Sequence, residues 1–504
     1  MADANMNQTT VQYDSLGRRV FLADPAAGVA RFELNGFDEI TRTEDALGRA
    51  TRFERDTLGR LVDQFDDADA VQHHYDYDTA LRPDGNPVLG ALAAMQSSEG
   101  VVDTFDYDSF SRNIGQSRLV DGQLLRFAYG LDSAGRTETV TYPSALSETL
   151  PVLRTTYDSS GEPTAVIFNG EPIWELREQD PRGMPTHEDI GGAAGLSRIT
   201  GYTRGGKLDN INTVRGVETF QDLAYDYSAV GLLSTRTDAL ANRTTRYRHD
   251  ELGRLTRVSE GAAGTGLSIT TERYAINVIG NLTSTFEGTL AYTDLAHPHA
   301  ATLLHNNRSG VDETFRYDDV GNAFIAGELG ITYTQSNLPR QIIAASEAVT
   351  FSYDATGARA TKRSAGLDIT YFGLYERERR GTANFERLSI PTPNGIIAQL
   401  EIRSGTLSDN PNDPQPKPST LRFLLSERQG TTETTWAAGE LPQHIRYDSY
   451  GAVRTPTGAL STGLPTPLVN HGFAVRRTQQ QSTVTNTRMI SASSIWAGAS
   501  TTRG

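Results

Sequence analysis

Apolar and polar residues alternate with a period of two along most of this chain, in short runs separated by turns. The flanks of Asp250 show the pattern, because "TTRYRHD" leads up to this residue and "RLTRVSE" follows Gly253. Such alternation predicts half-buried β-strands. A content of 47 Gly and 20 Tyr in 504 residues also favours strands and turns over helices. The predicted fold class is all-β.

One motif recurs at the turns between these runs. It reads "YDSLGRR" from Tyr13 and "HDELGRL" from His249, and looser copies begin at Glu44, Arg55, Tyr107, Leu131, Tyr157, Gln179, Tyr225, Tyr317, Tyr353 and Tyr447. The aspartates of neighbouring copies are evenly spaced, with 24 residues from Asp108 to Asp132 and 24 from Asp226 to Asp250. A repeat length in the low twenties is typical of a repeat architecture.

Each copy of the motif predicts a hairpin corner. Its Asp accepts hydrogen bonds from backbone N–H groups just ahead of it, and its Gly supplies the positive φ of a type I turn with a bulge. The aromatic residue before the Asp is placed to stack on its counterpart in the next repeat. A strand, turn and strand cannot bury their own face, so we expect the units to stack into a curved, spiralling sheet.

The pattern divides the chain into four segments. We expect a repeat array over 1–403, a Pro-rich polar loop over 404–422, a further repeat over 423–459 and a non-repeat tail over 460–504. The loop, "SGTLSDNPNDPQPKPSTLRF" with its flanks, has the composition of a flexible or polyproline II segment.

Charge and composition exclude several classes of function. A net charge of −15 and a pI near 5.1 disfavour a nucleic-acid partner, since the chain as a whole repels phosphates. The absence of cysteine excludes disulfides and thiolate zinc sites. The first residues lack the basic and apolar regions of a signal peptide, and no apolar run reaches the roughly 18 residues of a membrane span.

Candidate chemistry is sparse. The carboxylates of "DDAD" at Asp66–Asp69 and of "EDI" at Glu188–Ile190 are expected to lie in solvated acidic loops. In "HPHA", alternation would place His297 and His299 on one face of a strand as imidazole ligands, although metal binding is the minor alternative. No "GxSxG" or phosphate-binding glycine loop is present. We therefore predict no catalytic, cofactor-binding or metal-ligating residue, and no cofactor.

Five ordered segments, together with the repeats, resemble the RHS/YD-repeat family of bacterial Rhs polymorphic toxins, wall-associated proteins, insecticidal toxin complex C components and teneurins. They are "HPHAAT" from His297, "FRYDDVGNAF" from Phe315, "ITYTQSNLPRQI" from Ile331, "FSYDATGARATKR" from Phe351 and "TYFGLYERE" from Thr370. The resemblance implies a hollow β-sheet shell around a C-terminal toxin, which a "DPxG" stretch with catalytic aspartates releases in many members. "QDPRGMP" at Gln179 is the nearest string here, and its Asp180 is interpreted as a turn residue.

The resemblance implies a non-catalytic shell segment that lacks cargo and cleavage motif, and a toxin or a lid or shell protein as partner. The alternative is an extracellular repeat protein that binds carbohydrate or another cell surface. Secretion or a cell-surface location is implied, with a cytoplasmic stage before export. The tail "ASSIWAGASTTRG" permits a "YDP"-type segment in a shifted reading frame. We therefore expect a truncated, frameshifted fragment, disordered from about Arg476.

Overall fold

The computed structural model describes residues 1–454 apart from 193–194, 267–269, 308, 346, 406–418, 428–429 and 450–452. Its elements in this part of the chain are β-strands, without an α-helix, so the predicted all-β class is confirmed. Among the same residues no helix is long and apolar enough to cross a membrane. The tail predicted for 460–504 and most of the predicted Pro-rich loop lie outside the described residues. The end of that loop, Ser419–Arg422, belongs to a strand.

The described chain forms two compact units, and each combines two stretches that are distant in sequence. The first unit contains Met1–Gly135 and Ile276–Thr382, and the second contains Arg136–Ala275 and 383–454. A short strand, β24 (Ala275–Ile276), lies at the boundary. These units are defined by contacts between residues and not by sequence repeats. The four segments predicted from the repeat pattern therefore remain a prediction.

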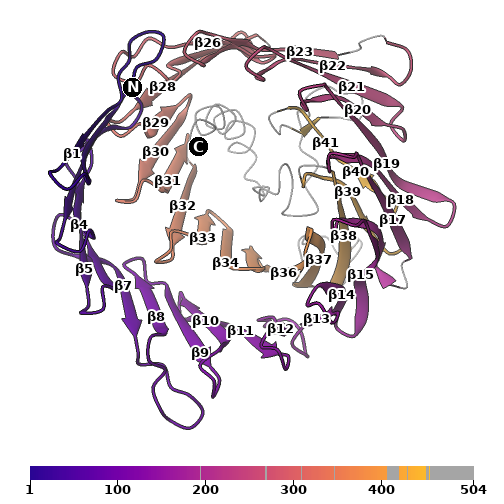
Figure 1. The fold of residues 1–504 in the computed structure, drawn as a ribbon, viewed down its shortest axis with the longest axis horizontal. Coiled ribbons are helices and arrows are strands. Elements are labelled where there is room, and N and C mark those ends of the chain that lie inside the picture. Colours follow the sequence, from indigo (N-terminus) through magenta and orange to yellow (C-terminus); the bar gives the residue numbers. More distant parts are fainter. Residues whose placement is uncertain are drawn as a thin grey trace. The chain divides into compact units, whose positions relative to one another are not determined.

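In the first unit, antiparallel hairpins follow one another along the chain (Figure 1). The strands of its first stretch are β1 (Thr10–Tyr13), β2 (Arg19–Asp24), β3 (Gly28–Leu34), β4 (Ile40–Glu44), β5 (Ala50–Arg55), β6 (Leu61–Phe65), β7 (Val71–Tyr77), β8 (Leu92–Ser97), β9 (Val102–Tyr107), β10 (Asn113–Val120) and β11 (Gln123–Leu131). Those of its second stretch are β25 (Leu282–Ser284), β26 (Gly288–Ala291), β27 (Leu303–Asn306), β28 (Asp312–Tyr317), β29 (Ala323–Ala326), β30 (Leu329–Tyr333), β31 (Pro339–Ala344), β32 (Glu347–Tyr353), β33 (Arg359–Ser364), β34 (Leu367–Phe372) and β35 (Tyr375–Arg380).

The second unit is built in the same way from strands that pair antiparallel with their neighbours, and its last two strands form a separate antiparallel pair. Its first stretch contains β12 (Thr137–Thr141), β13 (Val152–Tyr157), β14 (Pro163–Phe168), β15 (Glu171–Gln179), β16 (Pro185–Ile190), β17 (Leu196–Tyr202), β18 (Leu208–Arg215), β19 (Glu218–Tyr227), β20 (Leu233–Asp238), β21 (Arg243–His249), β22 (Leu255–Ala262) and β23 (Thr270–Arg273). Its second stretch contains β36 (Ala383–Thr392), β37 (Gly395–Ser404), β38 (Ser419–Ser426), β39 (Thr432–Ala437), β40 (Gln443–His444), β41 (Arg446–Tyr447) and β42 (Val453–Arg454).

Apolar side chains join the two stretches of each unit. In the first unit, Val101 and Val120 form a buried cluster with Ala360 of β33. In the second, Phe220 of β19 meets Trp436 of β39 edge to face, with ring centroids 5.4 Å apart. Burying these side chains stabilises the fold by roughly 25 cal/mol for each Å² of apolar surface removed from water. An individual hairpin cannot bury such a surface alone.

One predicted corner lies two residues later than the motif indicated. Asp226 of "YDYSAVGLL" belongs to β19, where its carboxylate accepts a hydrogen bond from Thr235. The turn is formed by Ser228, whose hydroxyl accepts from the Leu232 N–H at 3.1 Å. Ser228 occupies the position that Asp holds elsewhere because a short side-chain oxygen suffices to accept this bond.

Candidate functional site

The repeated turn is held by the carboxylate of its first residue. In the first turn, Asp14 Oδ1 accepts hydrogen bonds from the N–H groups of Leu16 and Arg18 at 2.9 and 3.0 Å, and Oδ2 accepts from Arg18 Nε at 2.7 Å. Gly17 follows with a φ of 80°. The backbone and side-chain hydrogen bonds from Arg18 hold the pKa of Asp14 below its ordinary value. The Asp14 carboxylate is therefore engaged in stabilising the turn.

Other residues build the same turn without the "YD" letters. The side-chain oxygen of Asn35 accepts hydrogen bonds from the N–H groups of Phe37 and Glu39. The Asn35 amide donates to the Glu39 carboxylate at 2.6 Å, so the first residue of this turn is the donor and the last is the acceptor, the reverse of Asp14 and Arg18. Asp38 takes the positive-φ position that Gly holds elsewhere. Thr334 uses a hydroxyl, which accepts from the Leu338 N–H at 3.1 Å. The spacing is kept while the chemistry varies.

The Arg or Lys that follows the Gly of a turn contacts the turn of a following hairpin. Arg18 Nη1 donates to the carbonyl of Asn35 at 2.6 Å, and Lys207 Nζ donates to the carbonyl of Gly231 at 2.8 Å. Arg60 instead forms an ion pair with Asp78 at 2.6 Å. These contacts link consecutive hairpins beyond their shared strand hydrogen bonds.

In several repeats, the tyrosine before the turn donates its hydroxyl to a carbonyl of an earlier strand or loop. Tyr107 donates to Leu92 at 2.8 Å, Tyr227 to Leu208 at 2.8 Å, and the same contact occurs for Tyr157, Tyr202, Tyr292, Tyr317, Tyr333 and Tyr353. Basic side chains lie over some of these rings, as Lys207 does over Tyr227 at 5.1 Å. The hydroxyl contact was not predicted, since the motif suggested only aromatic stacking.

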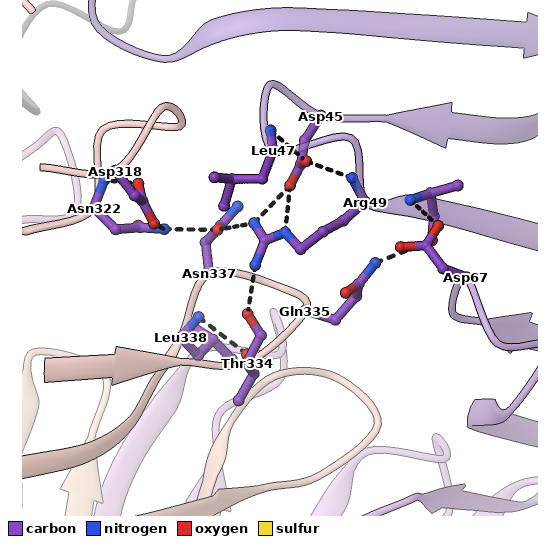
Figure 2. A network of polar contacts seen from close by, with 11 residues as sticks. Asp45, Leu47, Arg49, Asp67, Asp318, Asn322, Thr334, Gln335, Asn337 and Leu338 are labelled. Atoms are coloured by element: carbon purple, nitrogen blue, oxygen red, sulfur yellow. Dashed lines mark hydrogen bonds and ion pairs between the residues drawn. The ribbon is translucent and has the colours of Figure 1, made fainter. Parts of the chain in front are cut away.

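Turns from the two stretches of the first unit also meet one another, as Figure 2 shows. Arg49, which binds Asp45 within its own turn, donates to Asn337 Oδ1 at 2.8 Å across 288 residues of sequence. Asn337 also accepts from the Asn322 amide at 2.8 Å, and Gln335 donates to the carbonyl of Ala50 at 3.0 Å. Polar contacts therefore join turns of the first stretch to turns of the second stretch.

A cluster of buried charged side chains also joins the two stretches of the first unit. Arg118 donates to both carboxylate oxygens of Asp103, at 2.7 and 2.6 Å, and also contacts Asp354 and the carbonyl of Tyr371. Burial raises the pKa of Asp103, and the Arg118 guanidinium opposes that shift. With Arg118 pairing both carboxylates, the cluster acts as a structural tie between the stretches.

The second unit uses buried carboxylates in the same role. Glu386 of β36 accepts from the Ser144 hydroxyl at 2.5 Å and from the Ala145 N–H at 2.8 Å. Burial raises the pKa of Glu433 to about 7, although it pairs with Arg236. Sequence reasoning missed these residues, because a single Glu within a strand pattern carries no local signal for a partner 197 or 242 residues away.

The acidic run at Asp66–Asp69 is a turn whose carboxylates point to different partners. Asp66 caps the backbone of Ala68 and Ala70, and Asp69, with its side chain 79% exposed, pairs with Arg52 at 3.1 Å. The expected acidic loop is confirmed. Asp180 likewise caps Arg182 and Met184, at 2.8 and 3.1 Å, which confirms its interpretation as a turn residue.

The prediction for Glu188 was wrong. This residue lies in strand β16, is buried, and accepts hydrogen bonds from the Trp174 indole at 2.6 Å and the Asn394 amide at 3.0 Å. Asp189 on the same strand pairs with Arg177 at 2.6 Å. Burial is tolerated here because Trp174 and Asn394 satisfy the carboxylate.

The two histidines of "HPHA" do not share a strand face. They lie in the loop after β26, where His297 pairs with Asp294 at 2.9 Å and His299 contacts Asn281 at 3.0 Å. The loop replaces the expected alternation, and each imidazole has its own partner. In the described part of the chain no group of three or more His, Asp or Glu residues is arranged to hold a metal ion.

Comparison with known proteins identifies the repeat. Residues 227–265 match the family model described as RHS Repeat. A comparison with curated proteins finds no match.

Solved structures share the fold at low sequence identity. The crystal structure of TcdB2-TccC3-TEV matches 94% of this chain with a TM-score of 0.74 and 14% identity. That of TcdB2-TccC3 without its hypervariable C-terminal region matches 94% with a TM-score of 0.71 and 13% identity. A Photorhabdus luminescens Tc holotoxin pore matches 89% with a TM-score of 0.67 and 15% identity. The present chain spans about a quarter of each, with 26%, 26% and 25% covered.

Proposed function

We propose that this chain, which carries an RHS repeat and has the fold of the TcdB2-TccC3 structures, is a non-catalytic shell segment of an exported toxin-type protein. In that role its stacked hairpins enclose a toxin polypeptide, together with a further shell or lid chain. The observation that carries the proposal is the fold match over 94% of the chain at a TM-score of 0.74.

The use of polar groups supports a structural role. The turn aspartates are capped by backbone N–H groups, and the buried Asp103, Glu188 and Glu386 each bind partners that fix strands or loops in place. General acid–base catalysis needs ionisable groups that converge on a substrate pocket. These carboxylates instead hold neighbouring strands and loops together.

Protease protection tests the proposal. The full chain is co-expressed with the proteins encoded beside it, purified, and treated with trypsin before and after addition of denaturant. We expect a copurifying polypeptide that resists trypsin until the shell is unfolded. A preparation in which every copurifying polypeptide is digested as fast as in isolation would contradict an enclosing role.

A further inference from the structure

The turns of the first unit form two rows, because successive antiparallel hairpins turn at alternate ends of their strands. We call A-turns those that begin at Asp14, Asn35, Asp56 and Asp108 in the first stretch and at Asp318, Thr334 and Asp354 in the second. The turns at the other strand ends are the B-turns. They include Asp24–Gly28, Asp45–Arg49 and Ser97–Val101 in the first stretch, and the β31–β32 and β33–β34 turns in the second.

The A-turns of the second stretch lie against the B-turns of the first stretch. The contacts join Gly321 to Ala26, Asn337 to Arg49 (Figure 2), and the carbonyl of Tyr353, just before the Asp354 turn, to Ser97. The approach at Gly321 is so close that an added Cβ would collide with the Ala26 carbonyl oxygen. The chain itself therefore shows that a row of A-turns is covered by the B-turns of a neighbouring stretch.

The A-turns of the first stretch expose large apolar side chains. The third residue of each of these turns donates its N–H to the side chain of the first residue. These third residues are Leu16, Phe37, Leu58 and Phe110, with exposed fractions of 74%, 87%, 74% and 78%. We call this set the apolar line. Neighbouring turns of a row lie two strand spacings, about 9.5 Å, apart, and an exposed apolar surface of this kind marks an interaction site.

The same turn position has a different character in the turns that contact one another. Leu47 and Val320 are apolar there, and both are partly covered, with 42% of Leu47 exposed and Val320 half-buried. The exposed residues at this position are the polar Ser336 and Thr356. The chain therefore places apolar residues where another row covers the turn and polar residues where water does. By this rule the apolar line is a surface that another row covers.

The B-turns of the second stretch have the composition of a covering row. Ala345 of the β31–β32 turn and Ala365 and Gly366 of the β33–β34 turn are exposed, and an added Cβ at Gly366 would enter open space. Small residues also form the B-turn at Ala26–Gly28, against which Gly321 packs. They leave room for the close approach of another turn.

Charges at the two exposed rows match as well. In the contact within the chain, Glu99 of a B-turn pairs with Arg340, which follows an A-turn, at 3.2 Å. Glu347, beside the β31–β32 turn, and Arg19, directly after the first A-turn, are both exposed and supply the same combination. One chain thus carries both halves of the contact that already joins its own two stretches.

We propose that a second copy of this chain binds head to tail, with the apolar line of one copy packed against the second-stretch B-turns of the next. Such a heterologous contact leaves one exposed row at each end, so further copies add in series. The proposal rests on the contacts between turns alone. Its failure therefore leaves the shell role untouched.

Sedimentation velocity of the full chain over a wide range of concentration tests the proposal. We expect the wild type to form a dimer and then larger species as the concentration rises. The variant L16S/F37S/L58S should weaken association by about tenfold for each apolar side chain removed. Its melting temperature as a monomer should be unchanged, because the replaced side chains are exposed. Val217→Ser is the control, since Val217 is an exposed apolar turn residue of the second unit, and it should associate like the wild type.

A mixing experiment tests the direction of the contact. The variant E347R/A365R blocks the B-turn side, and L16S/F37S/L58S blocks the A-turn side. Each should be monomeric alone, whereas an equimolar mixture should form a dimer that grows no further, because each variant keeps one intact row. The proposal is overturned if the wild type stays monomeric, including the case in which it binds a different shell protein through the apolar line. It is also overturned if the E347R/A365R variant still dimerises alone, which would mean that two apolar lines pack against each other.

Discussion

The guanidinium of Arg118 on β10 holds the carboxylate of Asp103 on β9 through two hydrogen bonds, and both side chains are buried. The same guanidinium reaches Asp354 in the second stretch of the first unit. A pair on neighbouring strands therefore also fixes a turn that lies 236 residues further along the chain. The Tyr371 carbonyl and the Phe372 ring, 4.9 Å from the guanidinium carbon, complete its surroundings.

Replacing Arg118 with Met should lower the free energy of unfolding by about 3–5 kcal/mol, because two buried carboxylates lose their counter-ion. Thermal and urea unfolding measure the change. Arg126→Met is the control, since Arg126 is 59% exposed where it pairs with Asp106, and its loss should cost about 0–1 kcal/mol. Equal effects of the two substitutions would show that the buried cluster is not a structural tie.

The hydroxyl of Tyr317 should contribute about 1 kcal/mol to stability, through its hydrogen bond to the carbonyl of Ala301 at 2.9 Å. Burial raises the pKa of this phenol, so the group donates at any ordinary pH. We expect Tyr317→Phe to lower the melting temperature and Tyr13→Phe to leave it unchanged, since Tyr13 is 62% exposed and its hydroxyl has no described partner. If both variants melt with the wild type, the repeated contact is incidental to stability.

The sequence predicted the hairpins well because their determinants are local. Asp14 and Asp250 lie four residues from the arginines they bind, and the Gly between them sets the turn. Turns built on Asn35, Ser228 and Thr334 were harder to recognise, since several side chains offer the same oxygen acceptor.

The buried polar contacts could not be predicted from sequence. Glu188 reads as an ordinary acidic residue, and its burial depends on Trp174 and on Asn394, which is 206 residues away. The contact between Arg49 and Asn337 likewise depends on how the two stretches of the first unit meet. Periodicity fixes which face of a strand a residue occupies, but it carries no information on which distant turn will cover that face.

Gly321→Ala should destabilise the protein by more than Gly17→Ala. Both glycines have similar positive φ values, 83° and 80°, so an added Cβ costs each about 1 kcal/mol in backbone strain. At Gly321 the Cβ would also collide with the carbonyl oxygen of Ala26, whereas at Gly17 it meets open space. The excess, about 1–3 kcal/mol, measures the contact between the two turns.

Thermal unfolding of the two glycine variants gives this excess directly. A Gly17→Ala variant that melts as low as Gly321→Ala would mean that backbone strain alone decides the cost. The close approach of Gly321 to Ala26 would then contribute nothing to stability.

Glu433 should make the protein less stable as the pH rises from about 5 to 8. Burial raises the pKa of this carboxyl to about 7, and Glu427 and Asp238 act in the same direction, whereas Arg236 opposes them. In the unfolded chain the group titrates near its ordinary value of 4.5. Between these two values the folded state binds more protons than the unfolded state, so stability is highest below the unfolded pKa and is lost as the pH passes through the folded one.

The measurement is the difference in unfolding free energy between the wild type and Glu433→Gln across this pH range. The amide stays neutral and retains a hydrogen-bond acceptor for Arg236, so the variant should lack this part of the pH dependence, which is on the order of 1–3 kcal/mol. Parallel stability curves for the two proteins would show that Glu433 is already ionised at pH 5. In that event the ion pair with Arg236 outweighs burial, and the contact is a permanent link between β20 and β39.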